Sequence, residues 1–361
     1  MTLCCYSFAA VVLGMGLGQI KEPAGPLSPF GYVCYRASGQ IGVDGDLGDD
    51  AWMGAPWTAE FVDIEGAAKP KPRFRTRVKM LWDDNCLYVG AEIEEPHVWA
   101  TLTERDSVIF HDNDFEVFLD PDGDNHLYAE IEVNALGTVW DLLLVKPYRD
   151  GGPAVNGWDV AGLKVGVRVN GTLNDPSDTD RGWSVEIAIP WKALAEVAGR
   201  PCPPRHGDQW RINFSRVQWE TRIEGGRYEK VPNKPEDNWV WSPQGVIDMH
   251  RPERWGYLQF STMAPGSDVF RSDPGLPIRE ALHKVYYAQR AYREKHGRFA
   301  ESLQALGSLD LKLPQECSPI RIQATDSGFE ASVSWKAPDG KPIACRIRGD
   351  SRYWEEPDPG S

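Results

Sequence analysis

The stretch RFRTRVKMLWDDNCLYVGAEI, residues 73–93, decides the fold of this chain. Its first half alternates strictly between one side, which carries Phe74, Thr76, Val78, Met80 and Trp82, and another, which carries Arg73, Arg75, Arg77 and Lys79. A period of two residues is typical of a strand that buries one face. Turn residues follow at 83–85, and the alternation resumes at Leu87. The pattern therefore predicts a β-hairpin.

A second hairpin is predicted over residues 114–133, with a turn at 120–125. Phe115, Val117 and Leu119 alternate with residues that include Asp114 and Glu116, and a similar alternation with Glu130 and Glu132 returns after the turn, which predicts an acidic outer face. Further strands are predicted at residues 139–146, 163–170, 183–190, 210–217 and 255–260. Short strands separated by Gly, Pro and Asp clusters indicate an all-β fold, an antiparallel β-sandwich.

The pattern changes after Phe260. Residues 263–277 are rich in Pro, Gly and Ser, as linkers are, and apolar residues then follow a helical spacing that ends near Gly297. A shorter helix at 300–306 and strands around Ile320, Val333 and Ile347 complete a small α+β unit. The predicted domains are a signal peptide (1–20), the sandwich (30–262), the linker (263–277), the α+β unit (278–350) and an acidic tail (351–361).

The amino-acid composition limits the kinds of molecule that we expect the chain to bind. With 39 basic and 53 acidic residues the net charge is -14, which repels nucleic-acid backbones and anionic lipid surfaces. Fifteen Trp suit a protein that stacks flat rings on a ligand such as a sugar. We therefore expect no nucleic-acid partner.

The apolar segment Leu3–Leu17 is short for a membrane span and precedes a polar, Pro-rich stretch, as in a secretory signal peptide. We expect a secreted or periplasmic protein with no transmembrane segment after signal removal. A cytoplasmic protein with an apolar start stays open, because no Lys or Arg precedes the segment. Cys317 and Cys345 are the pair that could staple the C-terminal unit.

Several segments, in order along the chain, resemble the family 9 carbohydrate-binding modules, and in particular a bacterial group of exported family 9-like proteins. The strings are VDGDLGDDAW (43–52), WDDNCLYVGAEIEEP (82–96), HDNDFEVFLDPDGDNHLYAEIEVNALGTVWDLLL (111–144), GWSVEIAIPW (182–191), WRINFSRVQWE (210–220) and NWVWSPQGVIDMHRPERWGYLQF (238–260). The first resembles the family's opening strand and turn. The resemblance implies a β-sandwich that binds sugars, in proteins that handle polysaccharides.

The resemblance also implies a site in which two aromatic rings enclose a terminal sugar. Phe110 stands where one ring would lie, whereas Met249 and His250 stand where the family has the second, and Glu132 replaces a basic residue. Candidate replacement platforms are Trp219, Trp239 and Trp241. The polar groups that suit sugar hydroxyls are His111, Asp112, Asp114, Glu132, Asn134, Arg149 and Arg251.

Two other interpretations would explain some of the acidic residues differently. Glu130 and Glu132 would also fit a ladder of exposed ion pairs with Arg75 and Arg77. The carboxylates of Asp120, Asp122 and Asp124 alternate in a turn, as in a calcium site, and the family often carries structural calcium; ordinary turn chemistry explains the same residues.

The sequence as a whole predicts an exported, non-catalytic carbohydrate-binding protein that serves carbohydrate catabolism. A glycoside hydrolase, or a subunit of one, is the first alternative, although the sequence shows no isolated buried acid. The second alternative is a haem-binding sandwich, with Met80, Met249, His111 and His126 as the candidate axial ligands.

Overall fold

The computed structural model describes residues 22–23, 25 and 28–358. The predicted signal peptide (1–20) and the last three residues of the predicted tail lie outside the described residues. Within the described part, no helix combines the length and the apolar character that crossing a membrane requires.

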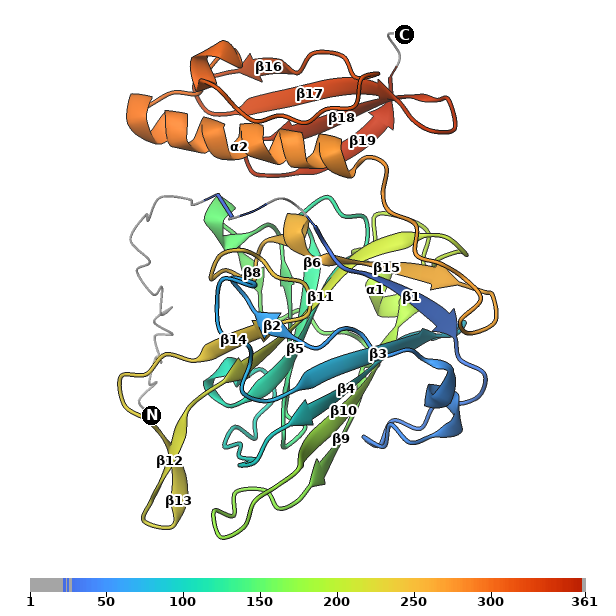
Figure 1. Ribbon diagram of the computed structural model, residues 1–361, viewed down its shortest axis with the longest axis vertical. Helices are drawn as coiled ribbons and strands as arrows, with labels where there is room; N and C mark the ends of the chain where they lie inside the picture. The colour runs from blue at the N-terminus through green and yellow to red at the C-terminus, as the bar shows by residue number, and fades with distance from the viewer. Residues whose placement is uncertain (1–21, 24, 26–27, 359–361) are drawn as a thin grey trace, which may run out of the picture.

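The main body is one large curled sheet of 13 strands (Figure 1). Its strands are β1 (Gly31–Arg36), β2 (Val62–Asp63), β3 (Thr76–Trp82), β4 (Cys86–Glu94), β5 (Asp114–Asp120), β6 (Tyr128–Asn134), β7 (Val139–Leu144), β8 (Ala154–Val155), β9 (Lys164–Asn170), β10 (Gly182–Pro190), β11 (Gln209–Gln218), β14 (Asp237–Val240) and β15 (Gly256–Ser261). They run in the order β8-β7-β6-β5-β11-β15-β1-β3-β4-β10-β9, with β14 paired to β11 and β2.

Both hairpins predicted from the alternation are confirmed. β3 pairs antiparallel with β4, with Thr76 opposite Ile93, and β5 pairs antiparallel with β6, with Phe115 opposite Val133. The sheet curls so that the inward faces of its two halves share one apolar core, which includes Val78, Val89 and Val117. This arrangement is the predicted β-sandwich.

The opening of the sandwich differs from the prediction. Residues 43–49 form turns, not a strand, because short Asp side chains bond to nearby main chain; Asp44 Oδ1 accepts the N–H of Asp46 at 2.8 Å. The first strand is instead β1, which the sequence pattern did not identify. It pairs parallel with both β15 and β3, so the sheet is mixed rather than purely antiparallel.

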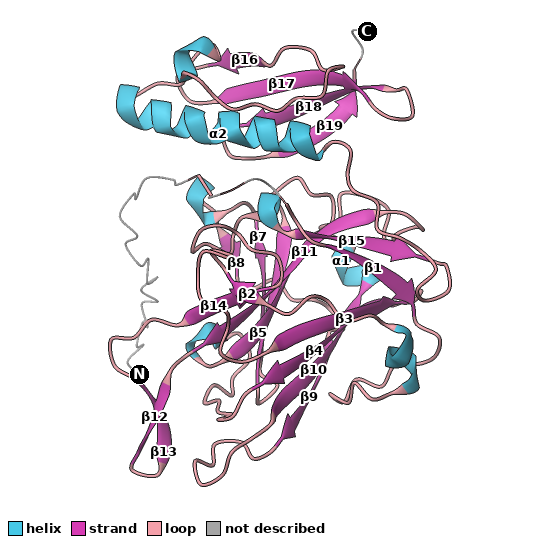
Figure 2. Ribbon diagram, in the orientation of Figure 1, coloured by secondary structure: helices cyan, strands magenta, loops and turns pink. Residues whose placement is uncertain are grey.

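The core holds the large aromatic residues that begin and end strands. Trp191 packs edge-on against Trp210 at a centroid distance of 5.6 Å, and Phe260 contacts both rings. A short helix, α1 (Trp191–Leu194), places Trp191 there directly after β10. Between β11 and β14 a separate hairpin, β12 (Thr221–Glu224) and β13 (Arg227–Lys230), projects from the body (Figure 2).

The C-terminal unit consists of one long helix and a four-stranded sheet. The helix is α2 (Leu276–His296), and it ends where Gly297 adopts a φ of 72°, a left-handed conformation that glycine accepts readily. The strands are β16 (Arg321–Ala324), β17 (Phe329–Lys336), β18 (Pro342–Arg348) and β19 (Tyr353–Pro357), in that order.

Three details of this unit correct the sequence prediction. The shorter helix is only a single 3-10 turn, Gln304–Leu306. The predicted acidic tail contains strand β19, because Tyr353 is buried and joins the unit's apolar core. Cys317 and Cys345 are both free thiols, so the unit is held by its core and not by a staple.

Helix α2 lies between its own sheet and the sandwich (Figure 1). The interface contains a buried ion pair: Arg149 Nη2 lies 2.9 Å from Glu253 Oε2, and the two side chains are 4% and 1% exposed. From the helix, Tyr287 donates its hydroxyl to Glu253 and accepts a bond from Arg251. Burial alone would raise the pKa of Glu253, but Arg149 and the other cations around it hold that pKa well below its usual range.

A second set of contacts involves the loop after β5. Arg279 of α2 donates to the carbonyl of Gly123 at 2.6 Å. Asn125 donates both to the carbonyl of Ser351 at 2.8 Å and to His283 Nε2 at 2.9 Å. Since His283 Nδ1 faces the carbonyl of Arg279, which can only accept, the ring is the neutral Nδ1–H tautomer. Its burial lowers the pKa of His283 to about 4.

We expect Glu253→Gln to destabilise the protein by about 3–5 kcal/mol, because it leaves the Arg149 guanidinium buried without its counter-charge. Urea unfolding followed by Trp fluorescence measures the loss. The control is Asp84→Asn, which removes an exposed partner of Arg36 and should cost less than about 1 kcal/mol. Equal effects of the two variants would contradict a buried, structural ion pair.

A pH series on His283→Gln tests the interface independently. The folded pKa of about 4 lies below the ordinary value of 6.5, so the wild type loses stability as pH falls from 6.5 towards 4 while the unfolded chain takes up a proton. The variant lacks this loss. The stability advantage of the wild type over the variant should therefore shrink over that range, by up to about 1.4 kcal/mol per pH unit, and a constant difference would contradict a buried neutral His283.

Candidate functional site

The outer side of β5 and β6 carries four carboxylates, which we call the carboxylate face: Asp114, Glu116, Glu130 and Glu132. The pairing register places Glu116 directly opposite Glu132 and Asp114 opposite Asn134. The alternation that predicted these strands sends Phe115 and Val117 into the core and the acids to the other side. Contrary to the predicted acidic outer face, the four residues are almost fully buried, at 0%, 5%, 5% and 1% exposed respectively.

No Lys or Arg among the described residues forms an ion pair with the carboxylate face, and its hydrogen bonds are few. Asp114 Oδ1 accepts the N–H of Val217 at 3.1 Å, and Glu132 Oε2 accepts the N–H of Phe110 at 3.0 Å. Asp114 Oδ2 and Glu130 Oε2 are buried and have no partner. Burial raises the pKa of all four groups, that of Glu116 to about 7, and neighbouring carboxylates raise those of Asp114, Glu130 and Glu132 further.

Aromatic rings border the carboxylate face. Phe110 and Trp140 are half-buried and lie 6.4 Å apart at an interplanar angle of 31°. Tyr148 is 50% exposed and packs edge-on against His250 at 4.5 Å. Burial and the charges of Glu130 and Glu132 raise the pKa of Tyr148 to about 12. Partly exposed rings beside carboxylates are the groups that sugar recognition requires.

Several predicted residues meet at this border. Trp219 Nε1 donates to the carbonyl of Phe110 at 2.8 Å, and Lys230 Nζ lies 3.5 Å from the Trp219 ring centroid. His111 is exposed with its ring 4.9 Å from that of Phe110. On the other side, Met249 and Trp140 both pack against a small apolar cluster that includes Trp255. His250 accepts or donates a bond with the Tyr128 hydroxyl at 3.0 Å, and burial lowers its pKa to about 4.

The side chains of Asp112 and Asn134 form hydrogen bonds with other groups of the protein. Asp112 accepts hydrogen bonds from the N–H groups of Thr101 and Leu102 and from the amide of Asn134. Asn134 Oδ1 in turn accepts two main-chain N–H groups in the turn after β6. These two side chains fix the loop beside the carboxylate face.

Other predicted residues lie elsewhere. Arg149 and Arg251 contact Glu253 and Tyr287 at the interface with α2. Trp239 and Trp241 are 3% and 1% exposed within the main core, so their rings present no face to solvent.

The predicted ladder of ion pairs between the two arginines and the glutamates of β6 does not form, and a different set of pairs takes its place. Arg75 and Arg77 both pair with Glu92 on the neighbouring strand β4, at 2.7 and 3.1 Å. Glu130 and Glu132 are therefore left without these partners. The sequence left this ladder open as an alternative, because alternation shows the face of a residue but not which strand lies beside it.

Four residues of this site are not among those predicted to bind sugar: Glu116, Glu130, Trp140 and Tyr148. Glu116 and Glu130 occupy the same alternating positions as Asp114 and Glu132, and this signal could have found them. Trp140 lies opposite Glu132 in the β6–β7 pairing, which only the register reveals.

The loop predicted to bind calcium brings its three carboxylates together, with ligand atoms within 4.8 Å of one another. Asp120 accepts the N–H groups of Gly123 and Asn125, as in an Asx turn, and Asp124 Oδ2 pairs with Arg352 at 2.8 Å. The loop thus also anchors the C-terminal unit.

The residues of the haem alternative take separate places. Met80 is fully buried in the main core, and His126 Nε2 bonds to the carbonyl of Asp350 in the C-terminal unit at 2.9 Å. Met249 and His111 lie at the border described above.

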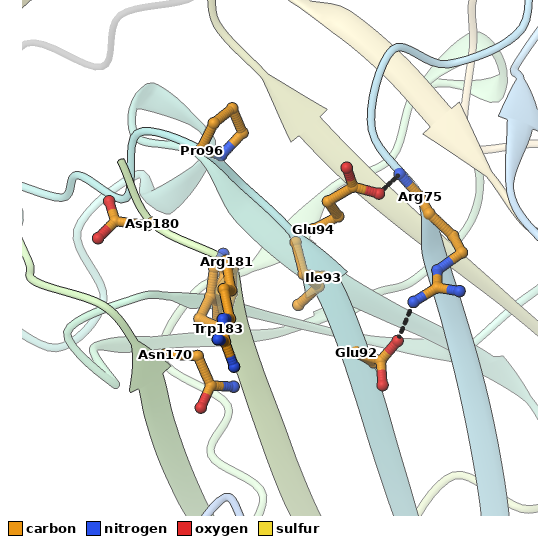
Figure 3. A pocket seen from close by; sticks show the side chains of 10 residues that line it. Arg75, Glu92, Ile93, Glu94, Pro96, Asn170, Asp180, Arg181 and Trp183 are labelled. Atoms are coloured by element: carbon orange, nitrogen blue, oxygen red, sulfur yellow. Dashed lines mark hydrogen bonds and ion pairs between the residues drawn. The ribbon is translucent and has the colours of Figure 1, made fainter. Parts of the chain in front are cut away.

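A cavity of about 460 Å³ lies elsewhere, at the ends of β4, β9 and β10 (Figure 3). Its acids are bonded within the protein: Glu92 pairs with Arg75, and Asp180 accepts the N–H groups of Val98 and Thr172. It contains none of the predicted carbohydrate-binding residues.

A family model matches part of the chain that carries the sequence patterns. Residues 43–203 match the family model described as carbohydrate family 9 binding domain-like. No curated protein matches the chain. Among solved structures, a family 9 carbohydrate-binding module from Caldicellulosiruptor kristjanssonii in complex with cellotriose is 16% identical, with a TM-score of 0.43 over 67% of this chain and 100% of that one. A candidate carbohydrate-binding protein from Bacteroides uniformis ATCC 8492 is 16% identical, with a TM-score of 0.48 over 65% of this chain and 100% of that one.

Proposed function

We propose, from the match of residues 43–203 to the family model described as carbohydrate family 9 binding domain-like, that the chain is an exported protein that binds a sugar at the carboxylate face without cleaving it. The matched segment contains all four carboxylates and the rings of Phe110, Trp140 and Tyr148.

One observation carries this proposal: partly exposed aromatic rings stand beside buried acids on the two signature strands. A ring can stack on the C–H face of a sugar, and the carboxylates can accept bonds from its hydroxyls. The main chain at Phe110 is held in place, since it bonds to both Glu132 and Trp219. A preformed site of this kind lowers the entropy cost of binding.

We expect Tyr148→Ala and Phe110→Ala to weaken glycan binding about tenfold each, because each removes a stacking surface worth about 1.4 kcal/mol. The measurement is retention of the purified protein in affinity gels that contain a panel of soluble polysaccharides, followed by titration with glucose, cellotriose and the best oligosaccharide.

The matched control is Trp354→Ala, which removes a half-buried ring on β19 in the C-terminal unit and should leave retention unchanged. Failure of every glycan to retain the wild type would contradict the proposal, as would equal effects of all three variants.

Hydrolysis is a second candidate function, because the structure places buried acids where the sequence showed none. A glycosidase needs one protonated and one ionised carboxyl group, and burial beside like charges separates pKa values in this way. The test is the release of reducing ends from a retained glycan. Release by the wild type, and its loss in Glu132→Gln, would show that the function is hydrolysis and not binding alone.

Export and a place in carbohydrate catabolism complete the proposal. Its support is the apolar segment Leu3–Leu17 and the family of the domain that follows. Expression with a C-terminal tag tests it: the proposal expects the protein in the periplasm or medium with its N-terminus shortened by about twenty residues. A full-length protein in the cytoplasm would contradict export.

A further inference from the structure

Three of the carboxylates on the outer side of β5 and β6 converge on one point. Asp114, Glu116 and Glu132 each offer an oxygen, and these atoms all lie within 4.8 Å of one another. Oxygen ligands bound to a common calcium ion at 2.3–2.6 Å stand no more than about 5 Å apart. The spacing therefore suits a shared cation without movement of the strands.

Two buried oxygen atoms give independent support for a missing partner. Asp114 Oδ2 belongs to a fully buried side chain and has no hydrogen-bond donor, although Oδ1 of the same group accepts the N–H of Val217. Glu130 Oε2 is also buried without a donor, and Glu130 interacts directly with Glu132. Buried polar atoms are normally satisfied, so these two point to a missing hydrogen-bond donor or cation.

The protein's own cations do not fill this role. Lys230, the cation whose field reaches Asp114, lies over the Trp219 ring and forms no ion pair with the four acids. The described residues contain two further clusters of three carboxylates, and both include ion pairs: Asp141 and Asp159 with Arg105, and Asp124 with Arg352. The carboxylate face is the one of the three clusters that no described Lys or Arg neutralises.

We propose that Asp114, Glu116 and Glu132 bind a calcium ion, with Glu130 beside them to complete the charge. Carboxylate oxygens without nitrogen or sulfur ligands select a hard cation, and calcium accepts the six to eight oxygens that water or a ligand's hydroxyls can complete. This site is distinct from the Asp120–Asp124 loop, although both lie on the same hairpin.

Isothermal titration of the full chain with CaCl₂ after EDTA treatment and dialysis, with MgCl₂ and MnCl₂ as further arms, tests the site. Glu132→Gln and Asp114→Asn keep the shape of the side chains and should each remove one bound calcium or weaken it at least tenfold. Asp122→Asn alters the Asp120–Asp124 loop and not the proposed site. It should therefore leave calcium binding at the proposed site intact. Asp159→Asn, in the cluster already neutralised by Arg105, is the matched control.

Thermal unfolding gives a second readout. Calcium at a hundred times its Kd should raise the wild-type midpoint by roughly 5 °C and leave that of Glu132→Gln unchanged. In EDTA the variant's midpoint should equal or exceed that of the wild type, because one buried charge is gone. A lower midpoint would overturn the proposal, as would a wild type that binds none of the three metals or a Glu132→Gln variant with unchanged calcium binding.

The calcium ion would also make glycan binding depend on calcium, an expectation that rests on the proposed function. If sugar hydroxyls complete the calcium shell, EDTA should reduce glycan retention at least tenfold and added CaCl₂ should restore it. Calcium binding without any glycan retention would overturn the proposed function and leave the metal site standing. Retention that is insensitive to EDTA would confine calcium to a structural role.

Discussion

The register between β5 and β6 is the constraint on which the rest of the structure depends. On one side of the pair, Phe115 opposite Val133 and Val117 opposite Ile131 complete the main core. A slip of one residue would turn these side chains outward, at about 1.5–3 kcal/mol for each large apolar group exposed. The core therefore holds Glu116 opposite Glu132 on the other side in spite of their mutual repulsion. Apolar packing fixes an arrangement of charges that electrostatics alone would oppose.

This constraint explains why the candidate site and the core are opposite sides of the same strands. Loops at the ends of the strands place Phe110 beside the acids, and the β6–β7 pairing places Trp140 opposite Glu132. Proteins commonly keep such locally unfavourable arrangements at functional positions and compensate for them elsewhere. Here the compensation lies in the apolar core on the reverse face of the pair.

The turn that joins β5 to β6 has a different consequence. Its residues Asp124 and Asn125 bond to Arg352, Ser351 and His283, so the hairpin that carries the candidate site also anchors the C-terminal unit. The buried pair of Arg149 and Glu253 adds a second anchor from the loop after β7. Residues that suggested sugar or metal contacts in the sequence thus hold the two parts together. Charged side chains fit either role, because a buried carboxylate or guanidinium needs a partner of any kind.

The sequence by itself determined the longer strands of the sandwich, the long helix and the core, because burial of apolar residues imposes periods of two and 3.6 that are local and readable. It also indicated the family, since the signature strings follow these strands in order. Tertiary structure alone decided that β1 lies between β15 and β3, that Arg77 pairs with Glu92 rather than with Glu130, and that the acidic side of β5 and β6 is buried. Periodicity gives the side of a strand on which a residue lies. What covers that side depends on segments far away in the chain, and no local pattern contains them.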